Sequence, residues 1–511
     1  MSLMFALSPI LIVAIGAALL MLAEAFGSPV AEAQIPNEPV DAGAGRSSEL
    51  ALVASVILFL AAILSIAVWL IGPEHLEGVD KVAPYLLIDR FTLFFTFVLS
   101  LGGALAALLA GGYLPEHRID RGEFFPLLLL STVGAMTLAA SGDLLSVFIG
   151  LETMSLGVYC LIGLRRSSVR AAEAAVKYFL LGSFAAALML FGFALLYGAT
   201  GHTDIKGIGE AVHAIGDGRS TVSAPTVIIA LVLNIVGLGF KVSAVPFHMW
   251  TPDAYEGAPT PATTYMAVAV KSAAFAVLLR ILLVGFGDER LLSWGAGWPP
   301  VLATLAVLSM TIANLIAGRQ ESVKRMLAYS SIAHAGYALV GVAATMRSSS
   351  EAQASVMFYL LAYTVSTAGA FGALVYCGSR GKEAVSYEDL AGVGRRHPAA
   401  ALAFSLFLLS LAGIPPSAGF FGKLYIFQAA IGAQLYVVSV IGLVNSAIGA
   451  YYYLRVMVFM YMREPAPGAP FAVPMRSGLV ASALVIAAVL VLALGIVPGS
   501  TLSMAASASL F

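Results

Sequence analysis

The sequence predicts an all-α, polytopic membrane protein with about fourteen transmembrane helices. Composition is the first reason, because 60% of the 511 residues are hydrophobic and 11% are charged, whereas soluble domains carry about 25% charged residues. The second reason is that apolar stretches of about 20 residues, long enough to cross a membrane as a helix, recur along the whole chain. The connections between them are mostly short. This pattern excludes a soluble enzyme.

The positions of the apolar stretches give the expected membrane spans. They cover residues 4–26, 50–72, 88–112, 124–141, 144–164, 172–199, 224–250, 262–287, 299–318, 323–345, 353–378, 401–432, 435–462 and 477–498. The first is expected to be a helix and not a cleaved signal peptide, because residues 1–23 contain no Lys or Arg. Residues 27–49, rich in Pro, Gly, Ala and Glu, are expected to form a solvated loop.

Positive charge is distributed unevenly between the two sets of connecting loops. Of the 27 Lys and Arg residues, fifteen fall in the odd-numbered loops and six in or beside the even-numbered ones. The larger group is Arg46, Arg118, Arg121, Arg165, Arg166, Arg170, Arg319, Lys324, Arg325, Arg380, Lys382, Arg395, Arg396, Arg463 and Arg476. Because loops rich in Lys and Arg stay in the cytoplasm, both termini are expected to face the periplasm or its equivalent.

The six remaining positive residues lie inside predicted spans. They are Lys177, Lys241, Lys271, Arg280, Lys423 and Arg455. A charge at mid-membrane costs about 2.5–3.5 kcal/mol on insertion scales, so these side chains need partners, water or a helix end. The two arginines, near predicted helix ends, are expected to extend to the membrane interface. The four lysines are candidates for a proton relay, because a buried lysine readily gives up its proton.

Three further titratable residues lie on or near predicted spans. Glu152 is the one carboxylate well inside a span, and the next span carries Lys177, so an intramembrane ion pair between them is expected. His248 and His334 are also candidates, because a neutral histidine can pass a proton between lysines. A hydrogen-bonded core histidine fits the sequence equally well, and the sequence leaves both alternatives open.

Two predicted spans contain sequences that interrupt a helix. Residues 241–246 (KVSAVP) and 413–416 (GIPP) contain proline, which removes an amide donor and frees a carbonyl. The simple alternative is a kink that improves packing. Discontinuous helices at membrane depth, however, tend to mark transport sites. Because Lys241 and Lys423 flank the two breaks, a transport role is favoured.

An internal repeat connects the two breaks. Residues 175–181 (AVKYFLL) are similar to residues 355–361 (SVMFYLL), and the break at Pro246 corresponds to the one at Pro415. Each copy holds five spans, an odd number, so the second is expected to be inverted in the membrane. The predicted organisation is three N-terminal helices (1–112), a first five-helix repeat (113–298), an inverted five-helix repeat (299–462) and a C-terminal helix (463–511).

Two long motifs carry a resemblance to a known family. Residues 240–261 (FKVSAVPFHMWTPDAYEGAPTP) and 173–184 (EAAVKYFLLGSF) resemble the subunit N family of proton-pumping NADH:quinone oxidoreductase, respiratory complex I. The similarity covers essentially all predicted spans. It implies an antiporter-like subunit of the bacterial inner membrane, whose partners are other membrane subunits of the complex, including neighbouring antiporter-like subunits, and lipids. A net charge of −1 gives no reason to expect nucleic acid.

The resemblance also implies roles for single residues. Glu152 and Lys177 would form a modulating pair, and Lys241 would be the central protonatable residue. Lys271 would connect two half-channels, and Lys423 would exchange protons with the periplasm. NADH, FMN, iron–sulfur clusters and quinone would be bound by other subunits, because this sequence contains no dinucleotide motif and no metal-ligand cluster.

The mechanism expected from these residues is electrostatic. A movement of Glu152 relative to Lys177 would change the field at Lys241 and release its proton toward Lys271 and Lys423. One alternative is a stand-alone cation/proton antiporter, which would transport when purified alone. A second is a structural spacer, in which the buried charges only fasten helices together.

Overall fold

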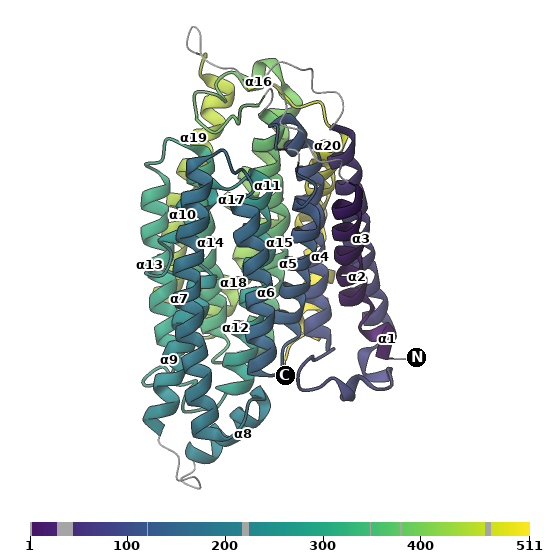
Figure 1. The fold of residues 1–511 in the computed structure, drawn as a ribbon. Helices are drawn as coiled ribbons and strands as arrows, with labels where there is room; N and C mark the ends of the chain where they lie inside the picture. Colours follow the sequence, from purple (N-terminus) through teal and green to yellow (C-terminus); the bar gives the residue numbers. More distant parts are fainter. Residues whose placement is uncertain are drawn as a thin grey trace.

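A computed structural model describes residues 3–27, 44–119, 121–216, 224–347, 349–378, 381–465 and 472–510. These residues form a bundle of helices that run along a common direction (Figure 1). The N-terminal and C-terminal ends of the described chain lie at the same end of the bundle, together with helix α8, and helix α16 lies at the opposite end (Figure 1). We call these the termini end and the α16 end.

The first half of the described chain is a series of helices. They are α1 (Leu3–Ala6), α2 (Ser8–Gly27), α3 (Ala44–Ile71), η1 (Pro73–His75), η2 (Val79–Lys81), α4 (Arg90–Glu116), α5 (Phe124–Ala140), α6 (Leu144–Ile162), α7 (Val169–Thr200), α8 (Ile205–Gly216), α9 (Ala224–Lys241) and α10 (Trp250–Gly257). One long helix then follows without interruption. Its parts are α11 (Thr260–Tyr265), the π-helical turn η3 (Met266–Val270), α12 (Lys271–Arg280) and the π-helical turn η4 (Ile281–Gly285).

The second half of the described chain is also helical. Its helices are α13 (Pro299–Ala317), α14 (Val323–Ala344), α15 (Ser349–Cys377), α16 (Val393–Arg396), α17 (Pro398–Ala412), α18 (Ala418–Gly432), α19 (Tyr436–Met462), α20 (Gly478–Ile496) and α21 (Pro498–Ser507). Every predicted span overlaps one of the helices in the two halves. Twelve helices of the described chain are long and apolar enough to cross a membrane, and the remaining predicted spans are the shorter α5 and the pair α17–α18. The all-α membrane class is therefore confirmed, whereas the inverted repeat stays a prediction.

Both predicted breaks are present. The first separates α9 from α10, and Ser243 within it has a positive φ of 65°. Its backbone is satisfied by the neighbouring helix, because the amide of Val245 donates to the Ser309 hydroxyl at 2.8 Å. The second break separates α17 from α18 at Gly413, whose φ of 85° is the left-handed conformation that favours glycine. Irregular backbone at membrane depth needs such protein partners.

Four long segments make up the centre of the bundle. Almost every residue of α4, of the helix from α11 to η4, of α14 and of α15 is buried, whereas the surrounding helices expose one apolar face. The central helix from α11 to η4 carries a π-helical turn on each side of α12. Such turns are frequent at functional sites, and α12 begins with Lys271.

Helices α5 and α6 approach closely at glycines. A Cβ atom at Gly134 would lie 2.3 Å from the Met154 amide nitrogen, and one at Gly150 would lie 2.7 Å from the Leu138 amide nitrogen. Small residues allow this approach of membrane helices. We expect Gly134→Val to separate the two helices and to lower stability by about 1–3 kcal/mol. Thermal denaturation of the purified protein in detergent measures this change.

A glycine on an open helix face provides the control. Gly198 of α7 has no heavy atom within 4 Å of its Cβ position, so Gly198→Val is expected to leave the melting temperature unchanged. Equal melting temperatures for the two variants would contradict the close packing of α5 against α6.

Candidate functional site

Lys241 is the last residue of α9, and its side chain turns into the bundle at the first break. The residue is 2% exposed. Its Nζ atom donates to the Ser155 hydroxyl of α6 at 2.8 Å and lies 5.4–5.8 Å from the ring centres of Tyr178, Tyr159 and Phe240. No carboxylate forms an ion pair with this amine in the described part of the chain.

Glu152 lies on the Lys241 side of α6. It precedes Ser155 by three residues and therefore faces the same side of the helix. Its Oε1 atom is buried and has no hydrogen-bond partner among the described residues, and its charge acts electrostatically on Lys241. The predicted ion pair between Glu152 and Lys177 is absent from the described structure, so that prediction is wrong.

Lys177 is paired with other carboxylates. Its ammonium lies 2.6 Å from Glu173 and 3.1 Å from Asp253. Glu173 is one turn earlier on α7, and α10, which carries Asp253, packs against α7. The Lys177 side chain is 45% exposed and lines a cavity of about 260 Å³. Across this cavity Arg325 of α14 pairs with Asp253 at 3.0 Å and with Glu256 at 2.9 Å.

Lys271 lies at the centre of the bundle. It is 2% exposed, and its Nζ atom donates to the Ser331 carbonyl at 2.6 Å and also to the Ser331 hydroxyl. The Tyr363 hydroxyl donates to the same serine oxygen at 2.8 Å, and the ring centre of Tyr363 lies 5.6 Å from the amine. Lys271, like Lys241, is thus held by hydroxyl groups and an aromatic ring.

His334 of α14 is close to both Lys271 and Lys423. Its Nδ1 atom lies 2.6 Å from the Tyr359 hydroxyl and its Nε2 atom 3.1 Å from the Tyr453 hydroxyl. Lys271 and Lys423 both act electrostatically on the ring. His334 is therefore a fully hydrogen-bonded core residue, and it is also placed where a relay between the two amines would need a group.

Lys423 extends from α18 to the second break. Its Nζ atom donates to the Ala412 carbonyl, the last of α17, at 3.0 Å and to the Ser446 hydroxyl of α19 at 3.0 Å. The ring centre of Tyr337 lies 5.0 Å away, and the residue is 7% exposed. The lysine therefore satisfies a carbonyl that the helix break leaves free. A side chain at Gly413 would contact Lys423, with its Cβ 2.9 Å from Cδ.

His248 does not join these residues. It lies in the first break, is partly exposed, and has a buried Nδ1 atom without a partner among the described residues. The adjacent Met249 is 69% exposed, so this part of the break lies at the surface of the chain. The geometry therefore gives His248 no contact with a lysine.

The two intramembrane arginines differ from each other. Arg280 was expected to extend to the interface, and this is wrong, because it is 2% exposed and forms a bidentate pair with Asp89 at 2.8 and 3.1 Å. Asp89 caps the first turn of α4, so the pair fastens α12 to α4. Arg455 does extend to a helix end, where its Nη1 atom donates to the Gly318 carbonyl at 3.2 Å.

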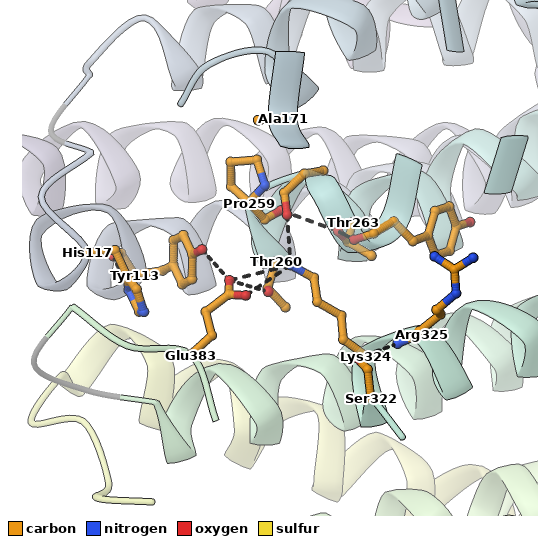
Figure 2. A network of polar contacts seen from close by, with 12 residues as sticks. Tyr113, His117, Ala171, Pro259, Thr260, Thr263, Ser322, Lys324, Arg325 and Glu383 are labelled. Atoms are coloured by element: carbon orange, nitrogen blue, oxygen red, sulfur yellow. Dashed lines mark hydrogen bonds and ion pairs between the residues drawn. The ribbon is translucent and has the colours of Figure 1, made fainter. Parts of the chain in front are cut away.

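A second buried polar cluster lies at the α16 end and was not predicted (Figure 2). The Lys324 ammonium donates to the Ala258 carbonyl at 2.8 Å and pairs with Glu383 at 3.2 Å. The Glu383 carboxylate also accepts hydrogen bonds from Thr260, at 2.8 Å, and from Tyr113. Lys324 is 1% exposed, although the sequence places it in a cytoplasmic loop. The one sequence feature that indicated burial of Lys324 was its position at the start of a predicted span.

The environment of Glu383 stabilises its charge. Burial raises the pKa of this carboxyl group, but the Lys324 ammonium and the hydrogen bonds from Tyr113 and Thr260 outweigh burial and hold the pKa below its ordinary value. The ion pair is therefore formed at neutral pH.

Comparisons with known proteins agree with this geometry. Residues 141–449 match the family model described as NADH:quinone oxidoreductase/Mrp antiporter, TM. A protein of Sorangium cellulosum named NADH-quinone oxidoreductase subunit N 1 is 68% identical, over 99% of this chain and 98% of its own length. A protein of Trichlorobacter lovleyi with the name NADH-quinone oxidoreductase subunit N is 43% identical, over 84% of this chain and 85% of its own length.

A solved structure of respiratory complex I from Thermus thermophilus contains a chain with the same fold. That chain is 34% identical, with a TM-score of 0.77, over 98% of this chain and all of its own length. A chain of the Mrp complex from Dietzia, 23% identical with a TM-score of 0.79, shares the fold over 99% of this chain and 97% of its own length. The chain belongs to the NADH:quinone oxidoreductase/Mrp antiporter transmembrane family, in the branch of NADH-quinone oxidoreductase subunit N.

Proposed function

We propose that this chain carries protons across the bacterial inner membrane as an antiporter-like subunit of NADH:quinone oxidoreductase, with Lys241, Lys271 and Lys423 as proton-binding stations. One observation carries the proposal: all three amines are buried, each bonded to a serine hydroxyl, and none is paired with a carboxylate in the described chain. An ammonium buried without a counter-ion is costly to keep charged, so each amine can both hold and release its proton.

The assembly around the chain is part of the proposal. The similar chain of Thermus thermophilus belongs to respiratory complex I, so neighbouring membrane subunits are the expected partners. NADH, FMN, iron–sulfur clusters and quinone would be bound by other subunits, and electron transfer there would drive the relay. The termini end would face the periplasm, as the distribution of Lys and Arg predicts.

In this proposal, buried hydroxyl groups would carry the proton from Lys241 toward Lys271. The hydroxyls of Tyr178, Ser243 and Thr251 are buried and have no partner among the described residues. Tyr255, one turn after Thr251 on α10, lies next to Ser331, which binds Lys271. Buried hydroxyls of this kind are usually satisfied by water, and a chain of hydroxyls and water conducts protons.

The proposed route from Lys271 to Lys423 has more hydrogen-bonded groups along it. Ser331 and His334 lie three residues apart on α14, and His334 bonds Tyr359 and Tyr453. Tyr337, one turn further, places its ring next to Lys423. In this proposal His334 transfers protons between the two amines, and Lys423 releases them toward the termini end along α18.

Glu152 and Lys177 would control the first station. Glu152 acts on Lys241 with a carboxylate that has no ion-pair partner in the described structure, while Lys177 is held by Asp253. If Lys177 left Asp253 and approached Glu152, it would neutralise the charge that stabilises a proton on Lys241. Release of the proton from Lys241 toward Lys271 would follow.

The variant Lys271→Ala tests the proposed relay. We expect proton pumping by the assembled complex in vesicles to fall about tenfold or more, because a missing proton acceptor costs at least this much. Lys206→Ala, which removes an exposed lysine of α8, is the matched control and should pump like the unmodified complex. Normal pumping with Lys271→Ala would refute the proposal.

A further inference from the structure

The cluster at the α16 end contains titratable groups that the relay does not use. Glu383 and Lys324 form its ion pair, and Tyr113 donates to the carboxylate. The His117 ring stacks on Tyr113 with ring centres 4.1 Å apart, and its Nε2 atom is buried without a partner among the described residues. We propose that Glu383 and Lys324 form a gate that takes up protons from the solvent at the α16 end and passes them to Lys271. This inference depends on the relay proposed above.

Glu383 is placed to meet the solvent. It belongs to the segment between α15 and α16, and its side chain is 22% exposed whereas that of Lys324 is 2% exposed. The segment is fixed to the start of α14, because the Val323 amide donates to the Val385 carbonyl at 2.6 Å and Ser322 pairs with Ser386. The partly exposed side chain is therefore held in one position, with its carboxylate bonded to the buried lysine.

The same helix leads from the gate to the relay. Lys324 and Ser331 lie seven residues apart on α14, which is two turns, so they share a face and are about 10 Å apart along the helix. Ser331 is the residue that binds Lys271. Lys324 of the ion pair and Ser331, which binds the Lys271 amine of α12, thus lie on one face of α14.

A second helix supplies a hydroxyl between these positions. Thr367 lies one turn after Tyr363 on α15, on the same face and toward the α16 end. Its hydroxyl is buried and has no partner among the described residues. A proton moving from Glu383 toward the Tyr363 and Ser331 hydroxyls would pass the Thr367 hydroxyl.

The proposed transfer returns Glu383 and Lys324 to their starting charges. A proton from the solvent binds a Glu383 carboxylate oxygen, and the ion pair with Lys324 opens because the carboxyl group becomes neutral. The carboxylic acid then gives its proton through hydroxyls and water to the neutral Lys271 amine, which becomes an ammonium. Glu383 is a carboxylate again and pairs with Lys324, so Lys324 keeps its own proton throughout.

Variants of the gate separate uptake from a structural role. Glu383→Gln can still accept bonds from Tyr113 and Thr260 but cannot bind and release a proton, so we expect pumping to fall about tenfold. Removing both charges, as in Glu383→Gln with Lys324→Gln, avoids an unpaired buried charge, which is the usual reason that such variants unfold. This double variant is expected to assemble and to pump as poorly as Glu383→Gln. Glu388→Gln, an exposed position of the same segment, should pump normally.

The outcomes distinguish this inference from the relay. Assembled complexes in which the single or double glutamine variant pumps at the unmodified rate would overturn the gate. If neither glutamine variant assembles, Glu383→Asp tests the gate, because the shorter side chain moves the carboxylate away from Lys324. The gate predicts slower pumping in this variant, and an unchanged rate would overturn it. Loss of pumping in Lys271→Ala together with normal pumping in Glu383→Gln rejects the gate alone. Normal pumping in Lys271→Ala rejects the relay itself.

Discussion

Lys241→Ala is expected to abolish most proton pumping and to leave assembly intact. The amine is the station at the first break and lies next to Glu152, so its loss removes the proton acceptor of the first half. The fold tolerates the change, because the Ser155 hydroxyl keeps its bond of 2.5 Å to the Leu151 carbonyl. We expect a fall of about tenfold or more in pumping by the complex in vesicles.

Ser155→Ala is the control for this variant. It removes the hydroxyl that holds the amine but keeps the amine itself, so it loses one hydrogen bond worth about 0.5–1.5 kcal/mol. Its pumping should therefore be reduced much less than that of Lys241→Ala. A complex with Lys241→Ala that pumps like the unmodified one would show that this lysine is not a station.

Lys423→Ala is expected to lower both pumping and stability. The amine is the last station, so pumping should again fall about tenfold or more. In addition the Ala412 carbonyl loses its donor at the second break, and a buried unsatisfied group costs about 1–3 kcal/mol. Pumping in vesicles and thermal denaturation in detergent measure the two effects separately.

Ser446→Ala provides the comparison for Lys423. It leaves the bond between Lys423 and the Ala412 carbonyl in place, so the melting temperature should change less than in Lys423→Ala. An unchanged melting temperature in Lys423→Ala would contradict the role of the lysine in closing the break. Unchanged pumping would contradict its role as the last station.

The sequence predicts the positions of the spans, of both breaks and of the buried lysines 241, 271 and 423. These features depend on the local order of residues: apolar length determines which segments cross a membrane, and Pro246, Gly413, Pro415 and Pro416 interrupt their helices. The depth of a lysine along its own helix follows directly from this local information.

The partners of the charged residues could not be predicted in the same way. Lys177 meets Asp253 because α10 packs against α7, and Lys324 meets Glu383 because the segment after α15 is fixed to α14. Each contact joins residues far apart in the sequence. Hydrophobic periodicity indicates how deep a residue lies, but it does not show which helices are neighbours or which way a side chain turns.

Substitution of Lys271 by arginine tests most directly whether the buried amines transfer protons. Arginine keeps the positive charge and the donors that bond Ser331, but its guanidinium does not release a proton. The relay predicts that assembled complexes with Lys271→Arg pump as poorly as those with Lys271→Ala. Pumping at the unmodified rate in Lys271→Arg would show that only a fixed positive charge is needed at this position, and it would contradict the relay.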